Sequence, residues 1–159
     1  MINIASNGAM GKVVAARLSP GEDILKGIER ICSETNINNG LIMSGMGSLS
    51  KVAFYTPVKL PDKRAGYGYS NPILMDGPIE LLNMTGMICH DIKGNCLFHI
   101  HFTISNQNGK AFGGHVIEGC KVLLTTDIVI AEINTIEMER KFDEDLEVYI
   151  FDPKSLKKV

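Results

Sequence analysis

The sequence predicts an α+β fold, in which a mostly antiparallel β-sheet carries one main α-helix over about residues 20–36. Two observations lead to this class: a single helical stripe of apolar residues, and a series of short apolar runs separated by Gly, Asn and Pro. The order strand, helix and then many strands lacks the regular alternation that is typical of parallel α/β proteins. The length of 159 residues fits one domain over 1–159, with a core over about 12–151.

The helix is indicated by its start, its apolar stripe and its stop. Ser19-Pro20-Gly21-Glu22 has the spacing of a capping box, with proline at the first helical position. Asn38-Asn39-Gly40 supplies residues that tolerate the left-handed conformation in which helices end. Between these segments, apolar residues recur at helical spacing: Ile24, Leu25, Ile28, Ile31 and Cys32. We therefore expect the helix to begin near Pro20 and to end near Asn36.

Strands are expected on both sides of this helix. The segment Gly45-Met46-Gly47-Ser48 reads as a join between two strands, and 57–72 as a long, turn-rich loop. The charged segment 137–145 fits a solvated connection or a short helix. The expected strands cover 12–18, 41–46, 51–55, 79–88, 97–105, 111–118, 121–125, 128–136 and 146–151.

Composition and charge exclude several classes of protein. The formal net charge is −2, whereas domains that coat phosphate backbones concentrate Lys and Arg. No apolar run approaches the roughly 20 residues that cross a bilayer, and no basic start followed by a long apolar segment marks a secretory signal. We therefore expect a cytoplasmic protein outside the membrane. Reduced thiols are expected at its four cysteines, which include no C-x-x-C pair: Cys32, Cys89, Cys96 and Cys120.

Two histidines share one face of an expected strand. Residues 97–104 alternate, so that His99 and His101 point to one side while phenylalanines and isoleucines point to the other. The apolar side is expected to face the core. Both imidazoles then lie on the opposite face, two residues apart along the strand.

The turn after this strand brings a third histidine to the same place. Gln107-Asn108-Gly109 fits a three-residue hairpin loop with Gly109 in the left-handed conformation. Pairing Asn106 with Lys110 sets the register and places His115 directly opposite His101. Gly113-Gly114 could shift this register through a bulge, and the two glycines also leave room close to the backbone.

Three converging neutral imidazoles on a rigid hairpin suit a divalent metal ion, typically zinc. Three protein ligands leave a coordination position open, as in catalytic zinc sites, and water bound there has its pKa lowered toward about 7. The alternative is that His99, His101 and His115 are half-buried polar residues bonded to their neighbours. Spacing alone leaves both interpretations open.

Two glutamates are weaker candidates for a catalytic role. Glu80 interrupts an apolar strand and is a candidate ligand or general base, although a strand with one wet face explains it as well. Glu118 closely follows His115 and is a candidate partner of a metal ligand, or simply a turn residue before Gly119. The catalytic residues therefore stay open.

These motifs together resemble the plants-and-prokaryotes-conserved (PPC) domain. The resemblance runs from about Arg17 to about Ile136, and its most specific part is the combination H-x-H…G-G-H…G. The residues that carry it are Gly21-Glu22-Asp23, Gly45-x-Gly47-Ser48, Glu80-Leu81-Leu82 with Gly86, His99-x-His101, and Gly113-Gly114-His115 with Gly119.

The resemblance implies an α+β fold, a homotrimer and a metal site formed by the three histidines, as in bacterial and archaeal members. Plant relatives carry AT-hook segments that bind A·T-rich DNA, and prokaryotic relatives are often called DNA-binding by that analogy. The fold is also similar to that of α-acetolactate decarboxylase, a zinc enzyme with an H-x-H plus His arrangement. This chain has no Arg-Gly-Arg-Pro hook, and Ile79 stands where the family often has an aromatic residue.

Three functions follow as hypotheses. The first is a trimeric PPC-domain protein with a three-histidine metal site that binds DNA in a regulatory role, although the charge does not support DNA as a partner. The second is a metal-dependent lyase or hydrolase, with zinc, that acts on a small oxygen-rich substrate. The third is a trimeric scaffold in which the metal only stiffens a hairpin. An open coordination position favours the second hypothesis over the third, because a scaffold does not need one.

Overall fold

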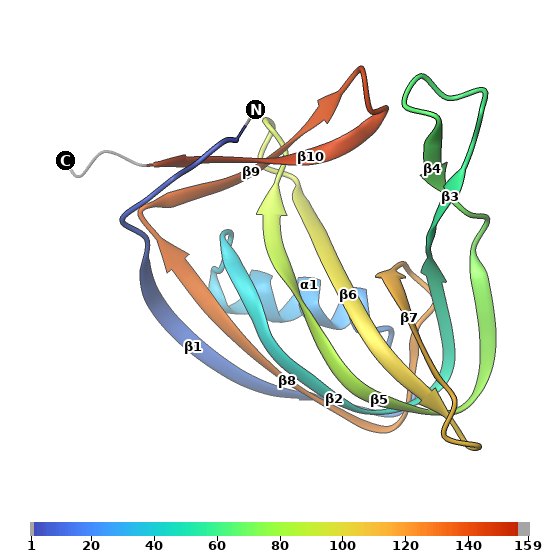
Figure 1. Ribbon diagram of the computed structural model, residues 1–159. Helices are drawn as coiled ribbons and strands as arrows, with labels where there is room; N and C mark the ends of the chain where they lie inside the picture. The colour runs from blue at the N-terminus through green and yellow to red at the C-terminus, as the bar shows by residue number, and fades with distance from the viewer. Residues whose placement is uncertain (1, 156–159) are drawn as a thin grey trace.

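A computed structural model describes residues 2–155 of the protein (Figure 1). Within this range the chain forms strands on both sides of one helix. The elements in chain order are β1 (Ala9–Leu18), α1 (Ile24–Thr35), β2 (Gly40–Tyr55), β3 (Pro57–Lys59), β4 (Tyr67–Tyr69), β5 (Ile73–His90), β6 (Cys96–Asn106), β7 (Ala111–Val116), β8 (Lys121–Asn134), β9 (Ile136–Asp143) and β10 (Val148–Ser155).

The main sheet has eight strands and closes partly on itself. Its order is β1-β8-β2-β7-β6-β5-β9-β10, and β2 also pairs with β5, so that β2, β5, β6 and β7 form a ring. The pairings are antiparallel apart from one parallel bridge between His90 and Glu139. β3 and β4 form a separate two-stranded hairpin. A mostly antiparallel sheet with a helix is therefore confirmed, although α1 is a minor part of the fold.

The helix and the candidate site lie on opposite faces of the curved sheet. In Figure 1, α1 runs behind the strands. Ile24 and Ile28 of α1 are fully buried. In β6, Ile104 is fully buried and Ile100 is 1% exposed. These residues belong to one apolar core. Because side chains alternate along a strand, the residues between the isoleucines of β6 point away from this core.

The helix begins later than the sequence indicates. Its N-cap is Asp23, whose carboxylate accepts hydrogen bonds from two backbone N–H groups of the first turn, at 3.0 and 3.4 Å. Gly21 adopts φ +82°, which a helix excludes, so the preceding residues form a turn instead. Glu22 still accepts a bond from the backbone N–H of Ser19 at 2.6 Å, so half of the expected capping box forms. At the other end, Asn36 is a left-handed C-cap, close to the expected stop. This helix is not long and apolar enough to cross a membrane.

Two pairs of expected strands are single long strands. β2 runs through the glycine-containing segment 45–48, and β8 joins the segment 121–125 to most of the segment 128–136, ending at Asn134. The pairing of β2 with β8 shows register shifts on both sides of that glycine segment. The glycines therefore bend the strand through bulges rather than reversing it, because a bulge lets pairing continue beyond the bend.

Two segments expected to be irregular contain strands. The loop expected over 57–72 holds the β3–β4 hairpin, which pairs Pro57 with Tyr69 and Lys59 with Tyr67. The expected closing strand near the end is present as β10, but it pairs with β9, which lies in the segment expected to be a connection or helix. Both hairpins lie at the upper end of the sheet in Figure 1.

Most of the charges of β9 lie on one of its faces, and Arg140 lies on the other, so the apolar alternation of a strand is concealed. Met138 is 4% exposed, while its neighbours Glu137 and Glu139 form ion pairs with His90 at 2.6 Å and Lys154 at 2.7 Å. From the sequence, His90 precedes Asp91-Ile92-Lys93-Gly94, which predicts a hairpin loop with an exposed histidine. It is instead the last residue of β5, and its side chain is 13% exposed.

Candidate metal centre

The hairpin that carries the three histidines has the register that its turn predicts. Gly109 adopts φ +74°, and the backbone N–H of Asn106 donates to the carbonyl of Lys110 at 3.1 Å. The side-chain oxygen of Asn106 also accepts bonds from the backbone N–H groups of Asn108 and Lys110, both at 3.0 Å. β6 and β7 then pair without a register shift as far as His101 and His115.

This register brings the imidazoles of His99, His101 and His115 together. Their ring centroids lie 5.1–5.3 Å apart, and one ligand nitrogen of each falls within 4.8 Å of the others. The Nε2 atoms of His99 and His101 are 3.2 Å apart. Two nitrogens bound to one tetrahedral zinc ion at 2.0–2.1 Å would be about 3.3 Å apart, so this pair already has the required separation. The donor set therefore fits a divalent ion such as zinc.

His115 is the most enclosed of the three. Its Nδ1 atom is buried and has no hydrogen-bond partner, which is costly unless another group, such as a metal ion, binds there. The ring of Tyr69, from β4, lies 5.4 Å from that of His115, and Tyr55 lies 5.7 Å from Tyr69. A Cβ atom on Gly114 would lie 2.4 Å from the carbonyl oxygen of Tyr55. The glycine thus allows β7 to close against β2 and bring His115 into place.

The surroundings keep these imidazoles neutral. Burial lowers the pKa of His115 to about 4, and the neighbouring histidines and Arg140 add to this effect. Burial also lowers the pKa of His99, with a contribution from Arg140, and the pKa of His101. Because a protonated imidazole cannot bind a metal ion, neutral rings at pH 7 leave the site ready for one.

Arg140 is a neighbour of the site that sequence reasoning missed. Its guanidinium donates to the carbonyl of Phe98, at 3.2 Å, and to that of Tyr149, at 2.6 Å. Phe98 directly precedes His99 in β6, so the positive charge is held beside the histidines. The Nε atom of Arg140 is buried without a partner. The strongly charged segment around Arg140 gave no sign that it forms a strand, and this hid its position.

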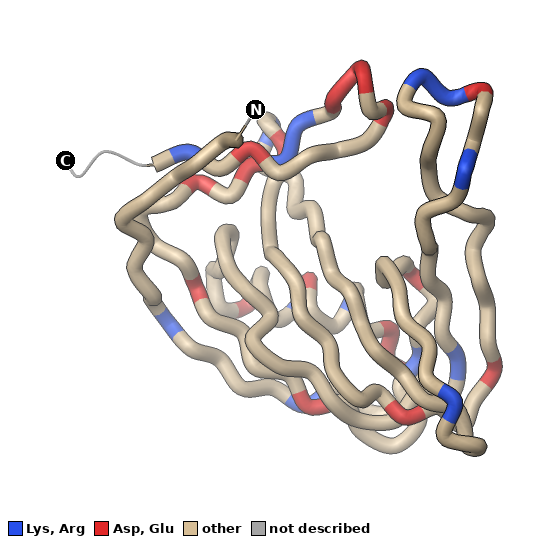
Figure 2. The backbone as a smooth tube through the Cα atoms, viewed as in Figure 1, with Lys and Arg blue, Asp and Glu red and all other residues tan. Residues whose placement is uncertain are grey.

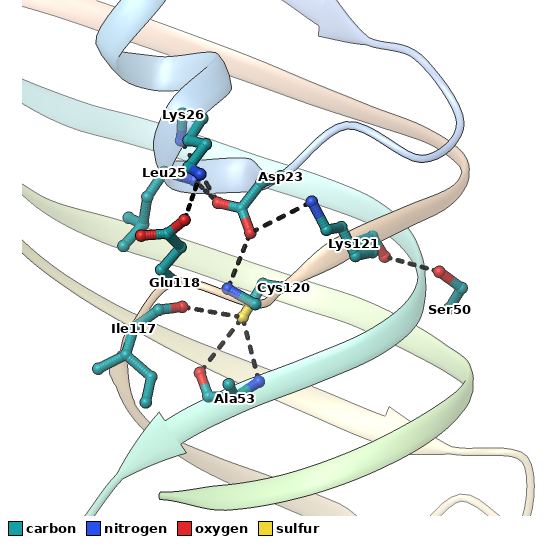
Figure 3. Close-up of polar contacts among 10 residues, drawn as sticks. Asp23, Leu25, Lys26, Ser50, Ala53, Ile117, Glu118, Cys120 and Lys121 are labelled. Carbon is teal, nitrogen blue, oxygen red and sulfur yellow. Dashed lines mark hydrogen bonds and ion pairs between the residues drawn. The ribbon is translucent and has the colours of Figure 1, made fainter.

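The structure places the two candidate glutamates away from the histidines. Glu80 is exposed and lies opposite Ser105, on the histidine face of the sheet. Ser105 is four residues from His101 along β6, so Glu80 lies roughly 13 Å from His101 in the direction of the strands. Glu118 forms an ion pair with Lys26 of α1, on the helix side (Figure 3). Neither carboxylate joins the cluster of potential metal ligands.

The same close-up explains why Cys120 is a structural residue. Its sulfur lies 3.3 Å from both the backbone nitrogen and the carbonyl oxygen of Ala53, and 3.5 Å from the carbonyl oxygen of Ile117 (Figure 3). Burial raises the pKa of the Cys120 thiol to about 11. The thiol is therefore protonated at pH 7 and fixes the loop that follows β7.

Comparison with known proteins shows a family. The family model for the Plants and Prokaryotes Conserved (PCC) domain matches residues 5–134. Two curated proteins from Synechococcus strains, each named Bifunctional protein GlmU, are 28% identical over 132 residues and 29% identical over 121 residues. These matches cover 83% and 76% of this chain, but only 18% and 17% of the relatives. The chain thus spans less than a fifth of their length.

Solved structures share the fold along almost the whole chain. A metal-containing protein, AF0104 from Archaeoglobus fulgidus, has a TM-score of 0.77 at 21% identity, covering 95% of this chain and 98% of its own. A plant- and prokaryote-conserved protein from Pyrococcus horikoshii has a TM-score of 0.74 at 25% identity, covering 92% and 96%. A Bacteroides thetaiotaomicron protein provisionally described as DNA-binding has a TM-score of 0.74 at 20% identity, covering 91% and 96%.

Proposed function

The chain belongs to the Plants and Prokaryotes Conserved domain family, and we propose that it is a metal-binding member whose His99, His101 and His115 hold a divalent ion, zinc above all. One observation carries the proposal: three imidazoles from one hairpin converge, with one ligand nitrogen of each within 4.8 Å of the others. The Archaeoglobus fulgidus relative is described as metal-containing, which supports a metal in this fold.

We further propose that the centre is catalytic and acts on a small oxygen-rich substrate, as a lyase or hydrolase. Three protein ligands leave at least one position for a ligand or for water, and a bound zinc ion supplies Lewis acidity there. The chain's own contributions are clear from the site. Tyr69 and Tyr55 shield one side of His115 from solvent, and Arg140 adds a fixed positive charge beside His99.

Metal titration tests the first part of the proposal. The purified protein is stripped with a chelator, dialysed, and titrated with Zn²⁺ while the bound metal is measured by calorimetry and elemental analysis. We expect one ion per chain and at least a hundredfold loss of affinity in His101→Ala. His90→Ala is the matched control, because His90 pairs with Glu137 outside the cluster. Equal metal content in the His101→Ala variant and the unmodified protein would show that the three histidines are not the metal site.

Turnover by the loaded protein tests the second part. We expect small 2-oxo or 2-hydroxy acids to be converted, and the conversion to stop in the presence of a chelator and resume when zinc is restored. Loss of turnover in His101→Ala, with His90→Ala unaffected, assigns the reaction to the centre. If a broad panel of such acids is left unchanged by the zinc-loaded protein, the catalytic proposal is wrong and metal binding stands alone.

A homotrimer and DNA binding are the remaining proposals from the family. The exposed apolar residues Met46, Leu82 and Leu124 on β2, β5 and β8 support an interface between copies, which sedimentation equilibrium tests by mass.

DNA binding is supported by the provisional description of the Bacteroides thetaiotaomicron relative. The net charge of −2 and the mixture of charges in Figure 2 argue against it. We expect no retention of duplex DNA at 50 mM salt, and retention that weakens steeply with salt would reverse this expectation.

A further inference from the structure

An apolar groove lies between the β9–β10 hairpin and the strands β2, β5 and β8 of the same sheet. Its volume is about 400 Å³, within the range of sites that hold small molecules. The sheet contributes Leu41 and Met87, and the hairpin contributes Met138 and Phe151. One end is lined by the N-terminal segment that includes Ile4. The lining is overwhelmingly apolar, so the groove by itself fits a hydrocarbon group.

Two residues that line the groove are paired across strands with residues at the histidine centre. Met87 of β5 pairs directly with His99 of β6, so their side chains are neighbours on one face of the sheet. On the hairpin, Phe151 pairs directly with Arg140, so these two side chains also share a face. The guanidinium of Arg140 in turn contacts the carbonyl of Phe98, one residue before His99. Both walls of the groove therefore lead from apolar residues to the candidate centre.

The charge at the histidine centre favours an anion. A divalent ion bound by three neutral imidazoles keeps two positive charges, and Arg140 adds a third. The candidate carboxylates lie outside the centre: Glu80 is on the same face but farther along the sheet, and Glu118 is on the helix side. Two N–H groups of the guanidinium are held by backbone carbonyls, which fix its position and leave further donors. A carboxylate is the simplest organic group that meets both a metal ion and a guanidinium.

We propose that the groove and the histidine centre form one ligand site, which takes a small organic carboxylate with an apolar tail. The carboxylate lies at the metal ion and Arg140, and the tail lies against Met87, Met138 and Phe151. This inference rests on the proposed metal site and names the class of substrate for it.

A chain-length series on the zinc-loaded protein tests the proposal. Butanoate, hexanoate and octanoate are titrated by calorimetry, with hexanol and hexylammonium as probes of the same tail and a different head group. We expect affinity to rise roughly fourfold for each methylene that enters the groove. Hexanol and hexylammonium are expected to bind at least tenfold more weakly than hexanoate, because neither carries a negative charge.

Two variants separate the head group from the tail. Arg140→Gln is expected to weaken hexanoate binding at least tenfold while metal content stays at one ion per chain. Lys141→Gln is the matched control, because Lys141 is the next residue of β9, on its opposite face, and pairs with Asp152. Met87→Ala is expected to flatten the chain-length series and leave butanoate unchanged. If Arg140→Gln fails to fold, hexanoate binding by Arg140→Lys and the chain-length series on the unmodified protein still test the proposal.

The outcomes distinguish this inference from the proposed function. If the protein takes up zinc but its carboxylate affinity is independent of chain length, the groove is not part of the site and the inference is wrong. If hexanol binds as tightly as hexanoate, the charge argument is wrong. If no zinc is taken up, the proposed function itself fails, and this inference fails with it.

Discussion

Replacing Asp23 is expected to be among the most destabilising exchanges outside the core. Its side chain is 2% exposed and accepts hydrogen bonds from the first turn of α1 and, at 2.8 Å, from the backbone N–H of Gly119 (Figure 3). Asp23→Ala loses an N-cap worth about 1 kcal/mol. It also leaves the Gly119 N–H without its partner, which costs about 1–3 kcal/mol. The sum is about 2–4 kcal/mol, or a fall in Tm of about 4–16 °C for a chain of this length.

The comparison of two substitutions at this position separates the N-cap from the other contacts of Asp23, which are the Gly119 bond and an ion pair with Lys121 at 3.8 Å. Asp23→Asn keeps an oxygen for the N-cap, since asparagine caps helices as well as aspartate does. Its NH₂ group then faces the Gly119 N–H, so we expect the loss of about 1–3 kcal/mol from that contact. The ion pair with the partly exposed Lys121 is also lost, but an exposed pair contributes little. Asp62→Ala, on the exposed turn before β4, is the matched control and should change stability by less than about 0.5 kcal/mol.

Urea unfolding followed by far-UV circular dichroism measures these changes. Chelator is present throughout and protein concentration is held fixed, because metal binding and assembly would both shift the transition. The expected order of stability is unmodified protein, then Asp23→Asn, then Asp23→Ala. If Asp23→Asn unfolds at the same urea concentration as the unmodified protein, the bond to Gly119 contributes nothing and the reasoning fails.

Three further predictions concern the histidine hairpin. The pKa of His115 is about 4 in the folded protein, below its unfolded value, so the unfolded chain takes up the proton first as pH falls. Stability of the metal-free protein should therefore be full above about pH 6.5 and decline between about pH 6.5 and 4, as unfolding at several pH values would reveal. Gly114→Ala should weaken zinc binding at least tenfold in calorimetry, because the added Cβ meets the Tyr55 carbonyl oxygen at 2.4 Å and displaces β7. Gly109→Ala, at φ +74°, should cost about 1–2 kcal/mol in urea unfolding and leave zinc affinity nearly unchanged.

The parts of the site that could be predicted from the sequence are those set by local chemistry. A three-residue turn fixes its own register, so alternation in β6 and the turn before Lys110 were enough to place His115 opposite His101. The helix start could not be read in the same way, because Ser19 and Asp23 are both good caps. The helix begins after Asp23 for two reasons. Gly21 has a left-handed φ, which breaks the expected first turn, and the distant Gly119 donates a hydrogen bond to Asp23.

The remaining features depend on pairing between distant strands, which could not be predicted from the sequence. The glycine segment of β2 reads as a turn when its neighbours are unknown, but pairing with β5 on one side and β8 on the other keeps it extended. In the same way, β9 reads as a solvated segment because most of its side chains are charged. Its strand character comes from pairing with β10 over its whole length.

The residues of the candidate site come from two separate parts of the chain. The three histidines come from one hairpin inside the region 5–134 that the family model matches. Arg140 and Phe151, which select the ligand in our proposal, come from β9 and β10, beyond that region. The arrangement allows one metal-holding hairpin to serve different ligands when the segment that follows it changes. It follows that exchanging residues 136–155 for the corresponding segment of a relative should alter carboxylate preference while zinc affinity is preserved, whereas the reverse result would place ligand selection in the hairpin itself.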